Sequence, residues 1–441
     1  MTTNSNSVLS ETENIKPLNI ANIEGRYSGF QFLKNGGVAS AKGFRASGVH
    51  AGFRKNPTRL DYALVVPDEP CACAGVFTQN VFCAAPVVVS KQHLGGVGYG
   101  TASVVAINSG IANAATGKLG LSVAKQSAEI ISGAIGCTTS EVMLASTGII
   151  GQHLQLEPFK TGTAQALDKL SRTGGADAAT AIMTTDTHPK QCAVSFSGNC
   201  MGIPNATFTV GGMAKGSGMI MPNMATMISV ITTDAPVQTD ALHEALKHAV
   251  SVSFNKVTVD SDTSTNDTCF LLASGKAAAG AEQIKIGTEA FNAFQDALCC
   301  VCINLAKQMA SDGEGATRLV TVNVSGAQSA CDADVAARAV ANSPLVKTAI
   351  YGRDANWGRI AGALGKSGAK FAQEDVAIDI MGIPVCRQGL TVPFSESEAL
   401  ARFEEHEVVI SVDLGAGSEC TTMWTCDFSH EYVSINGDYR S

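Results

Sequence analysis

The sequence lacks the features that mark a membrane protein or a nucleic-acid-binding protein. No stretch approaches the roughly 18 to 20 consecutive apolar residues that a membrane-spanning helix needs, although 45% of the 441 residues are hydrophobic. Only 31 residues are Lys or Arg and the formal net charge is -8, with no basic cluster that could neutralise a row of phosphates. We therefore expect a soluble protein whose partners include no membrane and no nucleic acid.

Spacings typical of metal sites are also missing. The 14 cysteines include Cys71-x-Cys73 and Cys299-Cys300-x-Cys302, but neither pattern has the C-x-x-C or His spacing of a zinc site. The run Asp260–Asp267 alternates oxygen ligands as an EF-hand does, yet it lacks the glycine at the sixth position and has Leu271 where the twelfth-position Glu should be. We expect reduced, buried thiols, no metal and no other cofactor.

The first residues carry no recognisable targeting pattern. Met1–Gly25 are rich in Asn, Ser, Thr and Glu, without the pattern of a secretory signal peptide or the Arg-rich pattern of an organelle transit peptide. We interpret residues 1–25 as a mobile tail and expect a cytoplasmic protein.

Internal repeats are absent, and short strand-like runs alternate irregularly with helical patterns. Strands are predicted at 62–66, 102–107, 227–231, 319–324, 376–380 and 408–412. Helices are predicted from an N-cap at Thr288 to near Gly313, from Asp240 through Val250, and from a capping box at Ser395. Because the rhythm is not strictly strand, helix, strand, the sequence predicts a layered α+β architecture in two or three lobes.

The segment Gly211–Met227 has the most unusual composition, with four glycines and a proline ahead of an apolar strand. We expect a strained or kinked loop there, because glycines allow backbone angles that other residues avoid. If the Thr226 hydroxyl attacks the carbonyl of Ala225, the resulting ester can be hydrolysed, which frees the Thr226 α-amino group. An unperturbed α-amino group has a pKa of about 7.7 to 8.0, so it can serve as the base for the same residue's hydroxyl. From these residues alone, an ordinary glycine-rich turn remains the alternative.

Motifs spread along most of the chain carry a family resemblance. They are Lys42–Ala46, Ser146–Gly151, Met183–Thr187, Lys215–Met227, Asp312–Thr317, Gly352–Arg359 and Ile435–Ser441. In order and spread they resemble the ornithine acetyltransferase family, also called glutamate N-acetyltransferases, from about Gly36 to Ser441. The resemblance implies a precursor cut between Ala225 and Thr226 into an α chain, residues 26–225 after the tail, and a β chain, residues 226–441. The two chains would assemble as a heterotetramer.

The resemblance also implies an acetyltransferase of arginine biosynthesis. N-acetylornithine would give its acetyl group to Thr226, ornithine would leave, and glutamate would take the acetyl group to form N-acetylglutamate. This is a ping-pong reaction through a covalent intermediate, which replaces one hard transfer by two easier ones. Whether acetyl-CoA is a second acetyl donor, which would make the enzyme bifunctional, stays open.

By motif match, the resemblance assigns Thr147 and Gly148 to the oxyanion hole, and a hydroxyl or backbone N–H at a tight turn suits a developing negative oxygen. The implied substrate contacts are Thr184, Lys215, Thr226, Glu314, Asn436 and Ser441. A cation such as Lys215 fits the substrate carboxylate, and we hypothesise that Glu314 meets the ornithine ammonium. Out of context, each of these residues would be interpreted as a solvated or capping group.

One position departs from the family pattern. Where family members often have Asn, the run Asn108–Ala115 has Ile111, which puts a local polar contact in doubt. Two other functions stay open: a self-processing amidohydrolase or aminopeptidase that passes the acyl group to water, and an uncleaved metabolite-binding protein. The segment Gly352–Arg359 is interpreted as structural or adjacent to the site.

Overall fold

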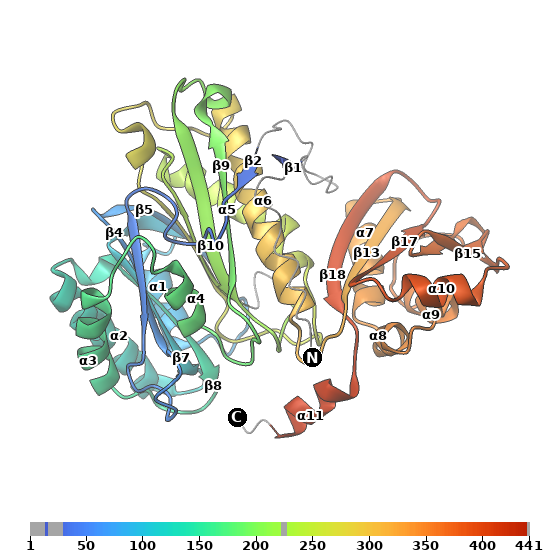
Figure 1. Ribbon diagram of the computed structural model, residues 1–441, viewed down its shortest axis with the longest axis horizontal. Coiled ribbons are helices and arrows are strands. Elements are labelled where there is room, and N and C mark those ends of the chain that lie inside the picture. The colour runs from blue at the N-terminus through green and yellow to red at the C-terminus, as the bar shows by residue number, and fades with distance from the viewer. Residues whose placement is uncertain (1–13, 16–29, 222–226, 439–441) are drawn as a thin grey trace, which may run out of the picture.

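Two stacked β-sheets form the larger lobe of the computed structural model, which describes residues 14–15, 30–221 and 227–438 (Figure 1). The larger of these sheets has eight strands in the order β1-β2-β9-β10-β11-β12-β5-β6. In that order they span Asn14–Ile15, Phe30–Phe32, Lys190–Ser197, Thr207–Lys215, Ile228–Thr233, Thr268–Ala273, Cys71–Phe77 and Tyr99–Ala102.

A four-stranded sheet packs against one face of the eight-stranded sheet. Its order is β3-β4-β7-β8, and its strands span Phe44–Val49, Tyr62–Pro67, Val104–Ile111 and Val142–Ile149. Val65 and Ile107 of this sheet share one buried apolar cluster with Val230 and Phe270 of the larger sheet. Helix α4 (Gly175–Ala181) contributes small buried side chains to the same interior.

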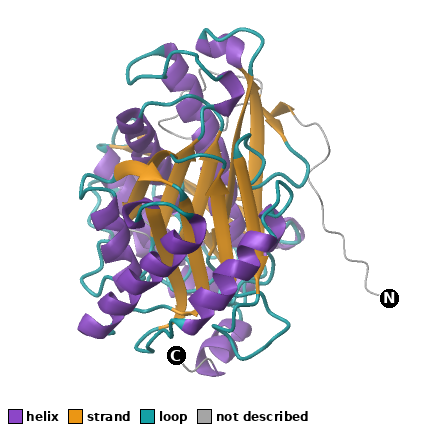
Figure 2. Cartoon of the chain, turned by 90° about the vertical axis from the view of Figure 1, so that its left-hand side faces the viewer, coloured by secondary structure: helices purple, strands orange, loops and turns teal. Residues whose placement is uncertain are grey.

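Helices cover both outer faces of the sheet pair. The eight-stranded sheet is covered by α5 (Thr239–Val252) and α6 (Glu289–Ser311). Figure 2 shows the opposite side, where helices lie across the four-stranded sheet: α1 (Ala85–His93), α2 (Gly117–Ile135) and α3 (Glu157–Asp168). The lobe is therefore a stack of helices, sheet, sheet and helices, which confirms the expected layered α+β architecture.

Strands from the second half of the chain lie inside the eight-stranded sheet, between strands from the first half. β10 pairs antiparallel with β11, from Val210 opposite Thr233 to Lys215 opposite Ile228. β11 pairs parallel with β12, which in turn pairs antiparallel with β5. The helix α5 joins β11 to β12, as a parallel pair requires a crossover connection. The two halves of the chain therefore share one hydrogen-bonded sheet and one core.

A smaller C-terminal lobe contains a six-stranded sheet in the order β16-β15-β14-β17-β13-β18. These strands span Leu390–Thr391, Ile383–Arg387, Ala377–Ile380, Glu407–Asp413, Leu319–Ala327 and Glu419–Cys426. The helices of this lobe are α7 (Ala330–Ala341), α8 (Pro344–Tyr351), α9 (Trp357–Gly365) and α10 (Glu396–Arg402). The last helix, α11 (His430–Asp438), leaves this lobe and runs back below the larger one (Figure 1).

Short 3-10 helices complete the described structure, at Thr139–Glu141, Gly198–Met201, Phe254–Lys256, Lys276–Ala278 and Gln373–Asp375. Over the described ranges, no helix combines the length and the apolar character needed to cross a bilayer. Residues 352–356 join α8 to α9 in the C-terminal lobe, and Asn356 caps α9 by accepting a hydrogen bond from Arg359 N at 3.3 Å.

The predicted helices are confirmed together with their caps. Thr288 Oγ1 accepts a hydrogen bond from Phe291 N at 3.1 Å at the start of α6, and Ser395 Oγ accepts one from Glu398 N at 3.2 Å at the start of α10. The strands predicted at 62–66, 227–231, 319–324, 376–380 and 408–412 correspond to β4, β11, β13, β14 and β17. The run 102–107 spans the end of β6 and the start of β7.

The prediction of a loop over Gly211–Met227 is wrong for the first five residues of this segment. Residues Gly211 to Lys215 belong to β10; all five pair with β11, and Gly211 to Ala214 also pair with β9. A Cβ atom at Gly211 would lie 2.2 Å from the carbonyl oxygen of Gly37. The glycine therefore serves the close approach of another backbone segment rather than a kink. The expected cleavage point lies in 222–226, outside the described residues.

The close packing at Gly211 predicts a stability difference between two Gly→Ala variants. Gly211→Ala should lower the free energy of unfolding by about 1 to 3 kcal/mol, the usual cost of overpacking. The control is Gly362→Ala in α9, where an added Cβ would meet no described atom within 4 Å outside its helix; it should be neutral or stabilise by up to about 1 kcal/mol. Apparent thermal midpoints measure both effects, and equal midpoints for the two variants would contradict this account.

Candidate active site

Six of the expected site residues line one pocket of about 310 Å³: Thr147, Gly148, Thr184, Lys215, Glu314 and Asn436. They come from the end of β8, the segment after α4, the end of β10, the segment after α6 and the C-terminal helix α11. The other expected residues, Ala225, Thr226 and Ser441, lie outside the described residues. Residues from five separate parts of the chain therefore line the same pocket.

The residues expected to form an oxyanion hole lie at the end of a strand, not in the tight turn that the sequence suggested. Gly148 in β8 lies opposite Gly110 in the parallel strand β7 and has a φ of 129°. A Cβ at this position would lie 2.2 Å from the carbonyl carbon of Gly110, so only glycine fits. The Asn266 side chain donates to the carbonyl oxygens of Ala112 at 2.6 Å and Ser146 at 2.8 Å. These bonds hold the two strand ends side by side.

The departure at Ile111 has an apolar explanation. Ile111 lies opposite Ile149 in the parallel pair of β7 and β8. Its side chain is partly buried against the apolar cluster between the four-stranded sheet and its helices. The carbonyl oxygen of Ile111 still accepts a hydrogen bond from Asn108 Nδ2 at 2.9 Å. The Ile111 side chain therefore makes apolar contacts at the position where an Asn side chain was expected to make a polar contact.

Two side chains of opposite charge, Lys215 and Glu314, line the pocket. Lys215 and Glu314 are each 8% exposed, and Gly218 leaves room for the carboxylate, since a Cβ there would lie 2.4 Å from Glu314 Cδ. Asn436 Nδ2 donates to Glu314 Oε2 at 2.8 Å, which ties α11 to the pocket. Such a pocket can bind a small molecule that carries both a carboxylate and an ammonium group.

A buried ion-pair network that we did not predict from sequence lies beside Lys215. Lys190 is fully buried and its Nζ lies 2.6 Å from Asp186 Oδ1 and 2.5 Å from Asp312 Oδ2. Burial alone would raise the pKa of Asp186, but Lys215 and Lys190 outweigh it and hold that pKa below its usual value. Burial lowers the pKa of Lys215, and Asp186 opposes that shift. Lys190 and Asp312 are 122 positions apart, so no local sequence pattern could have paired them.

Asp267 is a second buried acid that the sequence did not single out by itself. It is 2% exposed, and within the described part of the chain its Oδ2 has no hydrogen-bond partner. Burial raises the pKa of Asp267 well above its usual value, despite a hydrogen bond from the Met227 backbone N–H and an electrostatic contribution from Lys215. The carboxyl group therefore keeps its proton to higher pH than an exposed carboxyl group. Its backbone partner, Met227, is the residue that follows the expected nucleophile in the sequence.

The acidic run that superficially suggested calcium has a backbone role. The Asp260 carboxylate accepts hydrogen bonds from Met219 N at 2.6 Å and Ile220 N at 2.8 Å. It thereby fixes the segment that leads from the pocket toward residue 222. Both oxygens of this carboxylate are engaged by backbone N–H groups, which is a structural reason for an acid at this position.

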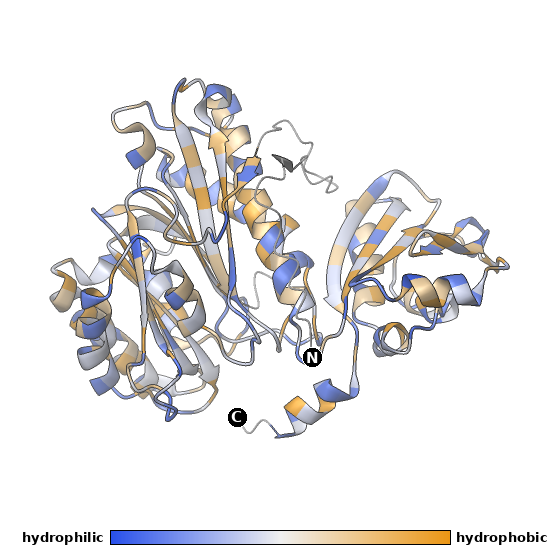
Figure 3. Cartoon of the chain, in the orientation of Figure 1, coloured by the Kyte–Doolittle hydropathy of each residue, from blue (hydrophilic) through white to orange (hydrophobic). Residues whose placement is uncertain are grey.

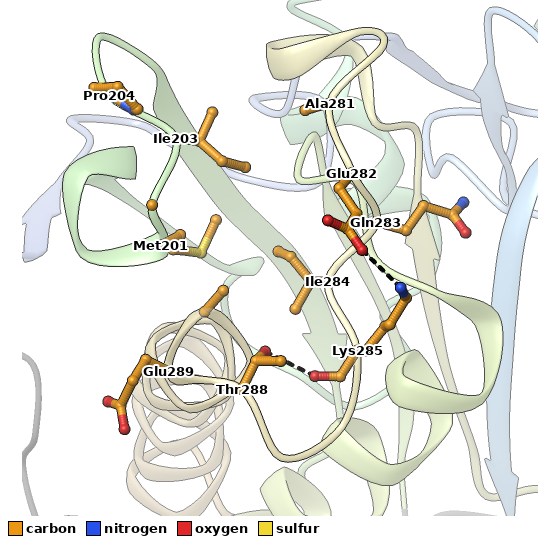
Figure 4. A pocket seen from close by; sticks show the side chains of 12 residues that line it. Met201, Ile203, Pro204, Ala281, Glu282, Gln283, Ile284, Lys285, Thr288 and Glu289 are labelled. Atoms are coloured by element: carbon orange, nitrogen blue, oxygen red, sulfur yellow. Dashed lines mark hydrogen bonds and ion pairs between the residues drawn. The ribbon is translucent and has the colours of Figure 1, made fainter.

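A larger cavity, of about 560 Å³, lies between Met201, Ile203 and Ile284 (Figure 4). Its ion pair, Lys285 with Glu282 at 2.7 Å, has both side chains more than half exposed. Most of its remaining lining is apolar or backbone, and the six expected residues lie in the other pocket. The smaller pocket is therefore the better candidate for group transfer.

The family model and two similar sequence relatives name one family. A family model described as "ArgJ family" matches residues 45–441. A protein named "Arginine biosynthesis bifunctional protein ArgJ" from Symbiobacterium thermophilum is 47% identical and covers 92% of this chain and 99% of its own length. Its namesake from Chlorobaculum tepidum is 46% identical, covering 91% and 96%. A solved ornithine acetyltransferase from Mycobacterium tuberculosis, described as complexed with ornithine, is 39% identical over 44% of this chain and all of its own, with a TM-score of 0.40.

The raised pKa of Asp267 predicts a pH-dependent stability difference. Because the folded pKa lies above the unfolded value of about 3.9, the wild type loses stability as pH rises between these two values. Asn does not titrate, so Asp267→Asn should gain stability relative to the wild type as the pH is raised from about 4, the unfolded value, toward neutrality. Apparent melting midpoints across that range measure the difference.

Asp186→Asn is the control of opposite sign. The lowered pKa of Asp186 means that its charge stabilises the folded state at neutral pH and that this stabilisation is lost on acidification. This variant should therefore lose stability relative to the wild type as the pH rises. A pH-independent offset for Asp267→Asn would contradict the raised pKa.

Proposed function

The chain belongs to the ArgJ family, and from this premise we propose that it transfers the acetyl group of N2-acetyl-L-ornithine to L-glutamate in arginine biosynthesis. The observation that carries the proposal is the meeting of Thr147, Gly148, Thr184, Lys215, Glu314 and Asn436 in one pocket. These are the described residues that the family resemblance implies for the oxyanion hole and the substrate contacts. Their assembly from distant parts of the chain supports a common role.

The proposed chemistry begins with self-cleavage. The Thr226 hydroxyl attacks the Ala225 carbonyl, the peptide bond becomes an ester, and water hydrolyses the ester to leave an amine on Thr226. In the first half-reaction, Thr226 Oγ attacks the acetyl carbon of N-acetylornithine while the Thr226 amine accepts the hydroxyl proton. The tetrahedral intermediate then expels ornithine, whose nitrogen takes that proton. The acetyl group stays on Thr226.

Glutamate completes the cycle. Its α-amino group attacks the acetyl carbon, and the proton that it loses returns to Thr226 Oγ as the ester bond breaks. In both half-reactions the Thr147 hydroxyl and the Gly148 N–H stabilise the negative oxygen. Loss of one such donor typically costs about 2.7 to 4 kcal/mol of transition-state stabilisation.

Substrate recognition follows from the charges of the pocket. Lys215 binds the α-carboxylate that both substrates carry, and Glu314, held by Asn436, binds the side-chain ammonium of ornithine. Thr184 and Ser441 supply further polar contacts, with Ser441 outside the described residues. The presence of both Lys215 and Glu314 in the lining of one pocket supports this assignment.

The division into an α chain (26–225) and a β chain (226–441) is part of the same proposal. The shared eight-stranded sheet supports a lasting association of the two pieces, because separation would break the pairing of β10 with β11 and of β12 with β5. Assembly into a heterotetramer and a cytoplasmic location also belong to the proposal. The relatives are named bifunctional, which supports a second reaction, for which we propose acetyl-CoA as the acetyl donor.

Self-cleavage is tested by mass spectrometry of the wild type beside Thr226→Ala. The wild type should give two pieces, residues 1–225 and 226–441, that run together under native conditions and separate only when denatured. Thr226→Ala should stay uncut and inactive, because it lacks the attacking hydroxyl. Active wild-type protein with only its original N-terminus would end the proposal, and the alternative of an uncleaved binding protein would take its place.

Transfer is distinguished from hydrolysis by the products. Purified protein with N-acetylornithine and glutamate should form N-acetylglutamate and ornithine in equal amounts. Acetate as the main product, formed at the same rate without glutamate, would instead indicate the amidohydrolase or aminopeptidase alternative. Thr226→Ala is the control for background reaction in both assays.

A further inference from the structure

Asp186 is shared unequally between two buried lysines. Its Oδ1 lies 2.6 Å from Lys190 Nζ, whereas its Oδ2 lies 4.0 Å from Lys215 Nζ. Each carboxylate oxygen also accepts a hydrogen bond from the backbone: Gly216 N donates to Oδ1 at 2.7 Å, and Thr184 N donates to Oδ2 at 2.9 Å. The carboxylate is thus satisfied without a close contact to Lys215, whose ammonium remains at the pocket.

Lys190 also engages the acid at the other side of the network. Asp312 Oδ2 accepts from Lys190 Nζ at 2.5 Å, and Asp312 Oδ2 accepts from Thr187 N at 3.1 Å. The carbonyl oxygen of Asp312 accepts a hydrogen bond from Ser217 Oγ at 2.6 Å, and Glu314 N donates to the carbonyl oxygen of Ser217 at 2.9 Å. One buried ammonium therefore joins the segments that carry Thr184, Lys215 and Glu314.

We propose that Lys190 is a positioning residue that occupies Asp186 and Asp312, so that the ammonium of Lys215 stays available to the α-carboxylate of the substrate. This inference rests on the proposed function, because it takes Lys215 as the carboxylate contact. Lys190 itself has no exposed surface and does not line the pocket, so it acts through its neighbours.

The balance of charges explains why Lys190 is needed. Two buried carboxylates, Asp186 and Asp312, face two ammonium groups, Lys190 and Lys215. Without Lys190, Asp186 would be a buried carboxylate with no close cation, which is strongly unfavourable. Lys215 is the nearest remaining cation, and it would move from its substrate-facing position to pair with Asp186.

Other basic groups nearby are engaged elsewhere. Arg54 donates through Nη2 to the carbonyl oxygen of Met183 at 2.7 Å. His188 Nδ1 lies 3.4 Å from Asp312 Oδ1. Of the two lysines that lie within 4.0 Å of the Asp186 carboxylate, Lys215 is the one that is left when Lys190 is removed.

A double-mutant cycle tests the inference through substrate selectivity. The two donors are N-acetylornithine and its α-carboxamide, which differs only in lacking the carboxylate charge. The wild type should prefer the acid in kcat/KM, and Lys215→Met should lose that preference. Lys190→Met should reduce the ratio of kcat/KM for the acid to kcat/KM for the amide by about tenfold or more. This is the effect expected from the loss of a hydrogen bond to a charged group. Lys190→Met/Lys215→Met should match Lys215→Met alone, since both changes act on one interaction.

A second variant tests the same role of Lys190 in case Lys190→Met does not fold. Lys190→Met/Asp312→Asn removes one negative charge together with the positive one, which reduces the unpaired charge in the core but leaves Asp186 without Lys190. It should show the same loss of selectivity. Lys256→Met is the matched control, because it breaks an ion pair of equal length, 2.6 Å to Asp334, away from the pocket; its ratio should equal that of the wild type.

The outcomes separate the two proposals. No acetyl transfer by the wild type would overturn the proposed function. Transfer by the wild type with a clear preference for the acid, combined with an unchanged ratio in Lys190→Met/Asp312→Asn, would overturn the role of Lys190 alone. A loss of activity toward acid and amide in equal proportion would show that Lys190 acts only as a structural residue.

Discussion

The pairing of β10 with β11 is the constraint on which the rest of the site depends. Lys215 is the last residue of β10 and lies opposite Ile228, the first residue of β11. Residues 216–227 therefore connect the two strands at this end of the strand pair. β11 and β12 are enclosed by β10 on one side and β5 on the other. A chain cut between Ala225 and Thr226 would leave every one of these strand pairings in place. Met227, the residue that follows the proposed new terminus, directly precedes Ile228, which is paired with Lys215.

Polar groups of the pocket lie at the same strand ends, because the four-stranded sheet packs against the eight-stranded sheet with the end of β8 close to the start of β12. Thr147 and Gly148 lie at the end of β8, and Asn266 precedes β12 and bonds to both strand ends of the small sheet. Asn266 thus joins the two sheets at the pocket. Thr147 and Gly148, the proposed oxyanion hole, are therefore positioned by strand pairing and by one buried amide, which leaves them little freedom to move.

Some of this arrangement follows from sequence and some of it cannot. The helix α6 was predictable from its Thr288 cap and its apolar spacing, and β4, β13 and β17 from their apolar runs, because both signals are local. The strand character of Gly211–Lys215 was not, since glycine disfavours strands and only the approach of Gly37 explains its presence. In the same way, motif resemblance brought Lys215 and Glu314 to attention, whereas Lys190 belongs to no motif. Its importance appears only when Asp312, distant in sequence, lies beside it.

The C-terminal lobe contributes to the pocket through one short stretch of chain at each of its ends. Glu314 lies between the end of α6 and the start of β13, and Asn436 lies on α11, which follows β18. Ser429 Oγ donates to the carbonyl oxygen of Gly315 at 2.5 Å, so entry and exit of the lobe are bonded to each other. A displacement of the lobe relative to the sheets would therefore move Glu314 and Asn436 together, and not one against the other. The carboxylate and its amide partner form a unit, and the position of that unit against Lys215 fixes the distance between the two charges that the pocket offers a substrate.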